Sequence, residues 1–265
     1  MKIALTIAGS DSGGGAGIQA DLKTFHQFGV FGTSVLVAIT AQNTRGVRAV
    51  EPVSEALVAA QLDALAEDLP PAALKTGMLA DVGIVRLVAQ AIREHQWAPL
   101  VVDPVMVSTS GHRLLTLEAE EVMRESLLPL AALVTPNLDE AAILTGRAVH
   151  DVASMERAAE TLLSFGASGA LVKGGHLPGD TLTDVLATAD GIRHFTRPRI
   201  ATTSTHGTGC TLSAAIAAGL ALGRDLETSV DDALDYVYRA IAAAPALGGG
   251  HGPLNHRVPA RGQET

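Results

Sequence analysis

Short apolar runs alternate along this chain with longer segments in which apolar residues recur at the spacing of a helix. Turn-forming residues such as Gly9 and Asp103 directly follow some of these runs, a pattern that is typical of strands buried on both faces of a sheet. The runs predicted to be strands are residues 3–8, 34–39, 73–75, 100–102, 132–134 and 169–172. The segments predicted to be helices are residues 17–28, 55–68, 82–94, 117–127, 139–144, 154–165 and 213–222.

Regular alternation of strand and helix is typical of a parallel sheet covered by helices on both faces. We therefore expect a three-layer α/β/α fold around a central, mostly parallel sheet. Residues 184–187 and 191–197 add an antiparallel hairpin to that sheet. No linker, repeat or low-complexity segment interrupts the chain, so we expect one domain over residues 1–265. The tail from Gly248 is rich in Gly, Pro and charge, and we expect it to be partly disordered.

Composition narrows the class of protein. Apolar residues make up 47% of the 265 positions, which is ample for a large core, whereas aromatic residues make up only 3%. The net charge of −9 and the scarcity of aromatic rings argue against a nucleic-acid partner. The single cysteine excludes an internal disulfide and fits a reducing compartment. The N-terminus turns polar too soon for a signal peptide, and no run approaches the ~20 apolar residues of a membrane span. We expect a cytoplasmic protein without membrane contact.

The most specific segment is His206-Gly207-Thr208-Gly209-Cys210-Thr211-Leu212, which contains that cysteine. An Ala-rich run predicted to be a buried helix follows, so the glycine turn should form the loop at its N-terminus. Free backbone N–H groups and the positive end of the helix dipole favour phosphate there. The same position should lower the pKa of a thiol. Phosphoryl transfer is the chemistry this indicates. The alternative is a buried cysteine in an ordinary glycine turn, and other segments must decide.

Several further motifs follow predicted strands, at the edge where parallel sheets bind ligands. Gly9 opens a run of small residues through Ala16 that lets the backbone approach a flat ligand, and the run matches neither a Walker A loop nor a dinucleotide fingerprint. Gln42 carries an acceptor beside a donor pair, which matches the edge of an aminopyrimidine. A loop-capping amide is its alternative. Met78 suits the wall of a ring pocket, or simply the core.

Charged and amide side chains follow the later strands. Asp103 could position Mg²⁺ or water, or cap a turn. Asn137 and Glu140 share one face at the start of a predicted helix, where they could organise hydrated Mg²⁺, form a capping box, or do both. Lys173 lies in a glycine turn and suits a nucleotide phosphate, with a solvated lysine as the alternative. The histidines lack the spacing of metal ligands, so we expect no tightly bound transition metal.

Together these segments resemble the ribokinase-like superfamily, and within it the hydroxymethylpyrimidine/phosphomethylpyrimidine kinases of thiamin biosynthesis. The resemblance runs from about Ala4 to Leu222 and comprises six segments in the family's order. The sharpest matches are residues 8–11 through 20–25, 135–137, 173–176 and 206–213. The last is the most specific, because sugar kinases of the superfamily carry Asp where this chain has Cys210.

The resemblance implies a ribokinase-like fold and MgATP-dependent phosphorylation of 4-amino-5-hydroxymethyl-2-methylpyrimidine, then of its monophosphate to the diphosphate. It assigns Cys210 as catalytic base and Gln42 as the residue that recognises the pyrimidine. Glycines of the anion hole are Gly207 and Gly209. The remaining implied positions are Gly9, Ala16, Met78 and Val105 for the pocket, Lys173, Thr208 and Asn137 for ATP and its phosphates, and Asp103 and Glu140 for Mg²⁺ through water.

Two alternatives to this function stay open from the sequence. A pyridoxal or pyridoxine kinase of the same superfamily would share the transfer machinery and differ in ring recognition. An inactive binding module could also retain the fold. One departure from the family is that residues 108–111 lack a basic residue that many members carry before the Ser-Gly pair. The expected partners are the pyrimidine, ATP and a second copy of the chain in a homodimer.

Overall fold

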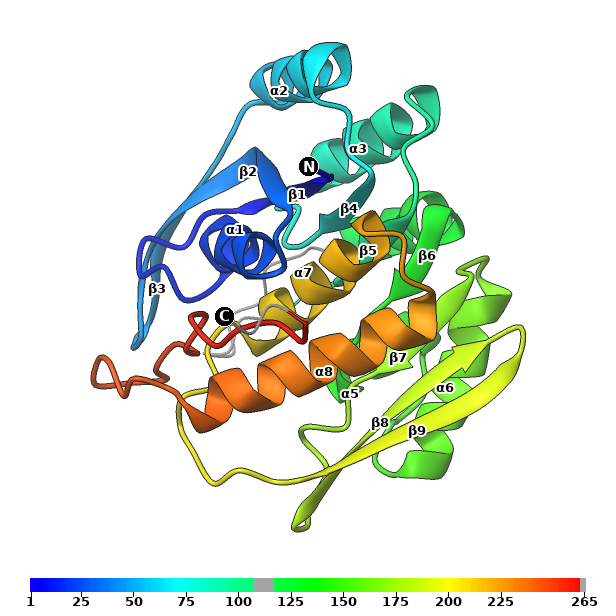
Figure 1. Cartoon of the computed structure of the whole chain (residues 1–265). Coiled ribbons are helices and arrows are strands. Elements are labelled where there is room, and N and C mark those ends of the chain that lie inside the picture. Colours follow the sequence, from blue (N-terminus) through cyan, green and yellow to red (C-terminus); the bar gives the residue numbers. More distant parts are fainter. Residues whose placement is uncertain (107–116, 263–265) are drawn as a thin grey trace.

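The structure is a computed structural model that describes residues 1–106 and 117–262. Within these ranges nine strands form one sheet in the order β3-β2-β1-β4-β5-β6-β7-β8-β9 (Figure 1). Strands β1, β2, β4, β5, β6 and β7 run parallel to their neighbours among these six, whereas β3, β8 and β9 are antiparallel. The expected mostly parallel central sheet is therefore confirmed. The strands are β1 (Ile3–Gly9), β2 (Phe31–Asn43), β3 (Gly46–Pro52), β4 (Ala73–Thr76), β5 (Leu100–Val102), β6 (Ala131–Val134), β7 (Gly169–Val172), β8 (Thr181–Thr188) and β9 (Gly191–Pro198).

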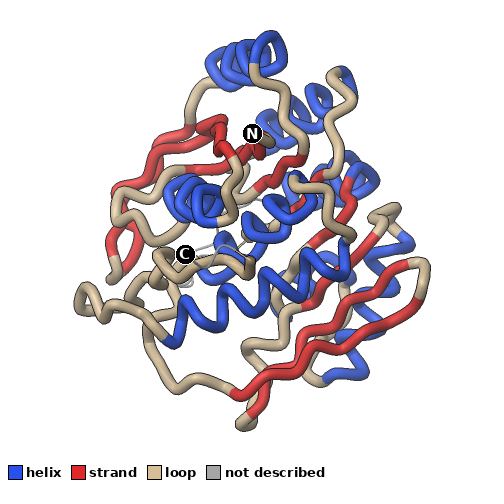
Figure 2. Tube along the Cα trace, viewed as in Figure 1, coloured by secondary structure: helices blue, strands red, loops and turns tan. Residues whose placement is uncertain are grey.

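Helices cover both faces of this sheet, as the tube view in Figure 2 shows. The core of one face includes residues of α2, α3, α4, α5 and α6, and the core of the other includes residues of α1, α7 and α8. Alternate residues of one strand enter opposite cores: Leu133 of β6 lies in one and Val134 in the other. The α/β/α layering is thus confirmed. The helices are α1 (Gly17–Gln27), α2 (Glu55–Asp68), α3 (Val82–Glu94), α4 (Leu117–Val122), α5 (Leu138–Thr145), α6 (Val152–Ser164), α7 (Thr208–Ala221) and α8 (Leu226–Ala242); a π-helical turn (Met123–Leu127) and a 3₁₀ turn (Leu128–Leu130) follow α4. None of the helices in the described ranges is both long and apolar enough to cross a bilayer.

The chain order of the strands reverses at β1. From β1 the chain proceeds to β2 on one side, and it later returns to place β4 on the other side of β1. At such a reversal the connections leave in opposite directions, which opens a site for ligands between them. Gly9 at the end of β1 and the segment after β4 therefore flank the natural binding position of this sheet.

Part of the tail from Gly248 packs against the fold. Leu254, His256 and Ala260 are buried, and Tyr236 of α8 donates a hydrogen bond from its hydroxyl to the carbonyl oxygen of His256 (3.0 Å). The Gly- and Pro-rich tail contains a few apolar residues, and these pack beside α1, α7 and α8. Burial of such side chains repays the loss of chain entropy.

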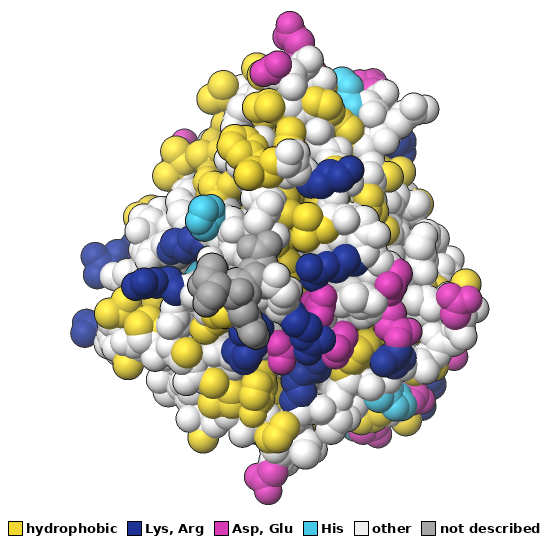
Figure 3. Space-filling model, in the orientation of Figure 1, with side chains coloured by type: hydrophobic (Ala, Val, Ile, Leu, Met, Phe, Trp, Pro, Cys, Tyr) yellow, Lys and Arg dark blue, Asp and Glu magenta, His cyan; other side chains and the backbone are white. Residues whose placement is uncertain are grey.

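Ion pairs hold the end of the tail against α8. Arg261 Nη1 lies 3.1 Å from Asp231 Oδ2 and 2.9 Å from Asp232 Oδ1. Figure 3 shows basic and acidic side chains mixed over this face of the molecule. The Arg261 side chain is about half exposed, which limits what these pairs contribute, so the buried apolar residues of the tail account for most of its attachment.

Candidate active site

The predicted motifs lie at one edge of the sheet, where the parallel strands end. Gly9 ends β1, Met78 follows β4 and Asp103 follows β5. Asn137 follows β6 and Lys173 follows β7, and a parallel bridge joins these two residues. Segments from both halves of the chain therefore meet at this edge. Residues 108–111, which carry the departure from the family pattern, lie outside the described residues.

Lys173, Asp103 and Glu140 form a charged cluster at this edge. Lys173 Nζ lies 3.2 Å from Asp103 Oδ1 and 3.9 Å from Glu140 Oε2. A Cβ built on Gly209 would lie 3.1 Å from Lys173 Nζ, so the first turn of α7 passes directly over the cluster. One turn further along α7, the Ser213 hydroxyl donates to Asp103 Oδ2 (3.4 Å). The glycine turn and the charged cluster thus form one polar site.

The charges within the cluster are not balanced. Burial raises the pKa of Glu140 from 4.5 to about 7, Asp103 adds to the shift, and Lys173 opposes it. Burial disfavours the charged form of Lys173, but Asp103 and Glu140 raise its pKa. Two carboxyl groups therefore lie beside a single lysine, and a further positive charge at this position would be stabilised by them.

This donor set fits Mg²⁺. Mg²⁺ takes carboxylate and water ligands and keeps several waters, so it needs few protein side chains. In the described ranges, no group of three or more His, Cys, Asp or Glu is placed to hold a metal ion by itself. The residues present fit a cation that arrives with phosphate and water ligands of its own.

Asn137 is engaged in a capping box at the start of α5. The side-chain oxygen of Asn137 accepts from the backbone N–H of Glu140 (2.9 Å), and the backbone N–H of Asn137 donates to Glu140 Oε2 (2.8 Å). The structural alternative for this pair is therefore confirmed. The box also fixes the Glu140 carboxylate beside Lys173, so capping and a role in the site are compatible.

The Cys210 thiol faces the backbone N–H of Gly17, where α1 begins. Part of the residue reaches the surface, but the thiol itself is surrounded by protein. Burial raises its pKa from 9.0 to about 12; Lys75 lowers the value, while Asp21 and Asp103 raise it. The expectation that the helix N-terminus lowers this pKa is wrong for this structure, because the loss of hydration outweighs the helix dipole.

The cation that acts on this thiol was not among the predicted site residues. Lys75 is fully buried in β4, with its ammonium 3.1 Å from Asp21 Oδ2 of α1. The Thr6 hydroxyl donates to the same carboxylate oxygen (2.6 Å). Asp21 and Cys210 both raise the pKa of Lys75 against the effect of burial. A lysine in a short strand that is buried throughout is a sign of such a buried pair, since an unpaired buried charge is costly.

The residues expected to form the ring pocket follow β1, β4 and β5 at this edge. A Cβ built on Gly9 would come within 2.6 Å of the Met78 methyl carbon, so the end of the Met78 side chain packs against this glycine. Ala16 caps α1 and donates its N–H to Asp11 Oδ2 (2.9 Å). Half-buried Val105 donates its N–H to the carbonyl of Asp103 (2.8 Å). The structure thus places Gly9 and Met78 in contact, with Ala16 on the adjoining loop and Val105 beside Asp103.

Gln42 lies near the end of β2 and is tied to two residues that the predictions omitted. Its amide lies 3.3 Å from His206 Nε2, which in turn lies 2.8 Å from Asp11 Oδ2. The Asp11 carboxylate also accepts the N–H groups of Gly13 (2.8 Å), Gly15 (3.0 Å) and Ala16. An aspartate inside a run of small residues is the sequence signal for such a turn. This contact joins the small-residue loop, β2 and the segment before α7.

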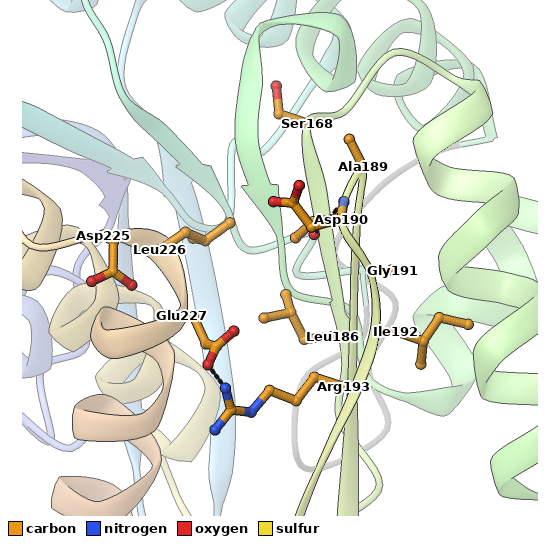
Figure 4. A pocket seen from close by; sticks show the side chains of 11 residues that line it. Ser168, Leu186, Ala189, Asp190, Gly191, Ile192, Arg193, Asp225, Leu226 and Glu227 are labelled. Atoms are coloured by element: carbon orange, nitrogen blue, oxygen red, sulfur yellow. Dashed lines mark hydrogen bonds and ion pairs between the residues drawn. The ribbon is translucent and has the colours of Figure 1, made fainter.

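A pocket of the described structure lies away from this edge. It measures about 610 Å³ and is lined by the β8–β9 turn and the start of α8, at the amino edge of the parallel strands. Figure 4 shows the Arg193–Glu227 ion pair across it. None of the predicted site residues lines this pocket. The carboxyl edge remains the candidate site, because the polar side chains meet there.

Comparison with known proteins identifies relatives over nearly the whole chain. The family model described as phosphomethylpyrimidine kinase matches residues 11–255. A hydroxymethylpyrimidine/phosphomethylpyrimidine kinase of Rhizobium meliloti is 54% identical over 257 residues, covering 96% of each chain. The crystal structure of phosphomethylpyrimidine kinase from Clostridium difficile is 43% identical, with a TM-score of 0.82 over 91% of this chain and 100% of the other.

Pyridoxal kinases share the fold closely. The ADP complex of Bacillus subtilis pyridoxal kinase is 39% identical and has a TM-score of 0.91 over 97% of both chains. This likeness confirms the ribokinase-like fold expected from the sequence. The family match over residues 11–255 and the relative at 54% identity decide between the two groups. This chain belongs to the phosphomethylpyrimidine kinase family.

Proposed function

We propose that this protein transfers a phosphoryl group from ATP to the hydroxyl of 4-amino-5-hydroxymethyl-2-methylpyrimidine, and then phosphorylates the monophosphate to the diphosphate. One observation carries the proposal: the Cys210 thiol lies where the loop after β1 meets the first turn of α7. The side chains suited to a pyrimidine lie toward β1 and β2. Those suited to phosphate lie toward β5, β6 and β7. A substrate alcohol bound between them would face the thiol.

The positions of the residues support the following roles. Backbone N–H groups from Gly207 through Thr208 and Gly209 to Cys210 would hold the transferring phosphoryl group, and Lys173 would offset its charge. Cys210 would accept the proton of the alcohol. Asp103 and Glu140 would hold Mg²⁺ through water, and Asn137 would fix the position of the Glu140 carboxylate through the capping box. When bound, Mg²⁺ would neutralise charge at the phosphates. Most of the catalysis would come from positioning, because phosphoryl transfer asks little covalent chemistry of the protein.

Ring recognition would fall to Gln42, whose donor and acceptor match the amino group and the adjacent ring nitrogen of the pyrimidine. Gly9, Ala16, Met78 and Val105 would form the surrounding walls. Names of the relatives specify hydroxymethylpyrimidine and phosphomethylpyrimidine kinases, and this supports the same substrates here.

A product assay resolved by mass tests the proposal. Purified protein with MgATP and the hydroxymethylpyrimidine should give the monophosphate first and then the diphosphate. Pyridoxal should be turned over with a lower kcat/KM under the same conditions. A higher kcat/KM for pyridoxal would instead assign the chain to the function of its structural neighbours. If the protein consumes no ATP with either substrate, it is instead an inactive binding module that retains the fold.

We also propose a cytoplasmic homodimer. The single free thiol suits a reducing compartment. Two large apolar side chains of the β2–β3 hairpin, Ile39 and Val50, are 54% and 41% exposed, and edge hairpins of this kind often associate. Light scattering at micromolar concentration should give twice the chain mass, and Ile39→Lys should lower it. A monomeric wild-type protein would refute the assembly and leave the kinase proposal intact.

A further inference from the structure

The amide of Gln42 is held between two side chains, and their protons determine which way it points. The atom drawn as its oxygen lies 3.2 Å from Thr40 Oγ1, and the atom drawn as its nitrogen lies 3.3 Å from His206 Nε2. A terminal amide fits the same space after a turn of 180° about its last bond, which exchanges these two atoms. The orientation must therefore be worked out from the neighbouring donors and acceptors.

Thr40 has one hydroxyl proton, and that proton is already committed. Thr40 Oγ1 lies 2.8 Å from the carbonyl oxygen of Ser10. A carbonyl oxygen only accepts, so the Thr40 hydroxyl donates its proton to Ser10. Toward Gln42 the hydroxyl can therefore only accept, through its lone pairs. Only the amide nitrogen can pair with those lone pairs. Thr40 therefore requires the nitrogen of Gln42 to face it.

His206 gives the same answer independently. Its Nε2 lies 2.8 Å from Asp11 Oδ2, and the Asp11 carboxylate accepts three backbone N–H groups as well. Burial opposes ionisation of Asp11, but these hydrogen bonds and His206 lower its pKa, so the carboxylate is an acceptor only. Nε2 must then carry a proton, which it directs at Asp11, and it has no lone pair to accept an N–H of Gln42. An amide oxygen at 3.3 Å can share this N–H as a second acceptor, whereas an amide nitrogen there would place two donors against each other. His206 therefore requires the oxygen of Gln42 to face it.

We propose that Asp11 and His206, together with Thr40, are positioning residues that lock the Gln42 amide with its oxygen toward His206 and its nitrogen toward Thr40. One N–H and one lone pair of the amide then remain for a ligand, in a fixed order. A 4-aminopyrimidine edge presents a donor and then an acceptor, and a 4-oxopyrimidine edge presents the reverse. The lock would make the site discriminate between these two edges. This inference rests on the proposed role of Gln42 in ring recognition.

The backbone around the lock supports a fixed geometry. The Gln42 N–H donates to Ser12 Oγ (2.8 Å), and the Ser12 hydroxyl donates back to the Gln42 carbonyl (2.7 Å). The His206 N–H donates to the carbonyl of Gly252 in the tail (3.1 Å). A Cβ built on Gly15 would lie 2.6 Å from His206 Cδ2, so the imidazole is packed against the loop that contains Asp11. Neither the glutamine backbone nor the imidazole is free to turn.

The test compares kcat/KM for 4-amino-5-hydroxymethyl-2-methylpyrimidine with that for its 4-oxo analogue. His206→Leu and Thr40→Val each remove one side of the lock, and each should lower the preference for the amino substrate by about 3–10-fold, the range for one neutral hydrogen bond. His206→Gln, which can place an amide N–H near the position of Nε2, should recover part of the preference. The KM for ATP should not change. His194→Leu is the matched control, since His194 lies in β9 and pairs with Glu156 of α6, away from Gln42.

The outcomes separate this inference from the proposed function. If Gln42→Leu lowers the preference but both His206→Leu and Thr40→Val retain it, the lock is refuted while the role of Gln42 stands. If Gln42→Leu also retains the preference, the role of Gln42 and the lock fail together. Should His206→Leu not fold, Thr40→Val decides alone, because valine has nearly the shape of threonine. The control His194→Leu should keep the preference for the amino substrate. If it loses as much preference as His206→Leu and Thr40→Val do, the effect of those variants is indirect and the proposal is overturned.

Discussion

The chemistry of single residues in this site is determined by burial more than by sequence position. Cys210 lies in the first turn of α7, a position that by itself favours the thiolate. Its surroundings instead raise the thiol pKa to about 12. The thiol is therefore protonated at neutral pH in this structure. Asp103 is one of the charges that raise the pKa, so neutralisation of this carboxylate would favour the thiolate and hence the base.

Substitution of Cys210 tests the base directly. Cys210→Ala should lower kcat by about 10²–10⁴-fold, the usual contribution of a general base. Cys210→Ser should behave like the alanine variant, and Cys210→Asp should recover part of the rate. Affinity for ATP should largely survive, because backbone groups form the anion hole. Melting temperatures of the three variants give the control for folding. Nearly normal turnover in Cys210→Ala would remove the thiol from the mechanism.

Glu140 should give a pH signature. Its pKa is raised from 4.5 in the unfolded chain to about 7 on folding, so the folded protein binds more protons between these values. The stability it contributes is present below pH 4.5 and is lost as pH rises through 7. Glu140→Gln keeps an acceptor for the Asn137 N–H and does not ionise. The melting temperature of this variant relative to wild type should therefore increase between pH 5 and pH 8.

The same Glu140→Gln variant should need more Mg²⁺ for half-maximal rate, because one carboxylate of the proposed cation site is lost. Glu94→Gln makes the same change of charge on the exposed side of α3 and serves as control. A Mg²⁺ requirement equal to wild type would contradict the metal role. A melting-temperature difference that stays constant across this pH range would contradict the burial argument.

At the scale of elements, α7 has to begin against the loop after β1. Gly207 caps the helix with φ of +83°, and a Cβ there would overlap the carbonyl oxygen of Gly15. Gly223, just beyond the other end of α7, has nearly the same φ of +84° but open space around its Cβ position. These two glycines therefore differ in crowding while the backbone strain is the same.

Alanine at each position should separate strain from crowding. Gly223→Ala should cost about 1–2 kcal/mol, the price of a left-handed residue, and leave turnover unchanged. Gly207→Ala should cost more, since the helix must move away from Gly15, and kcat should fall because the anion hole moves with it. Denaturant unfolding and steady-state kinetics on both variants measure this. Equal losses of stability and full activity in both would show that the two loops do not have to touch.

At the scale of the whole molecule, the tail closes the structure over α1 and α7. His206 pairs with Pro253 in a short parallel bridge, and the Thr211 hydroxyl lies 2.9 Å from His256 Nε2. Burial lowers the pKa of His256 to about 4, so this histidine is neutral at physiological pH. The tail thus supports the segment that contains the anion hole.

Two leucines of the C-terminal segment provide a matched test of this support. Leu254 is 3% exposed and Leu247 is 59% exposed. Leu254→Ala should destabilise the protein by about 2–5 kcal/mol, the usual cost of emptying a buried leucine site. Leu247→Ala should change stability by no more than about 0.5 kcal/mol. Similar unfolding midpoints for the two variants would show that the tail is dispensable to the fold.

The sequence determined the local elements and the layered class of the fold, because buried parallel strands and amphipathic helices have distinct apolar periods. Each predicted strand is present in the structure. The β2–β3 hairpin and α8 were not predicted. For β3 the reason is physical: its residues are half-buried to exposed, so they lack the continuous apolar run of a central strand.

The sequence also determined which chemical groups are available, including Gln42, Asp103, Lys173 and the glycine turn before Cys210. Only the tertiary structure decided which of them act on one another. It paired Lys75 with Asp21, placed His206 between Asp11 and Gln42, and raised the pKa of Cys210 where helix position alone suggested the opposite. Desolvation and contacts between segments far apart in the chain set these properties, and neither is encoded in a local motif.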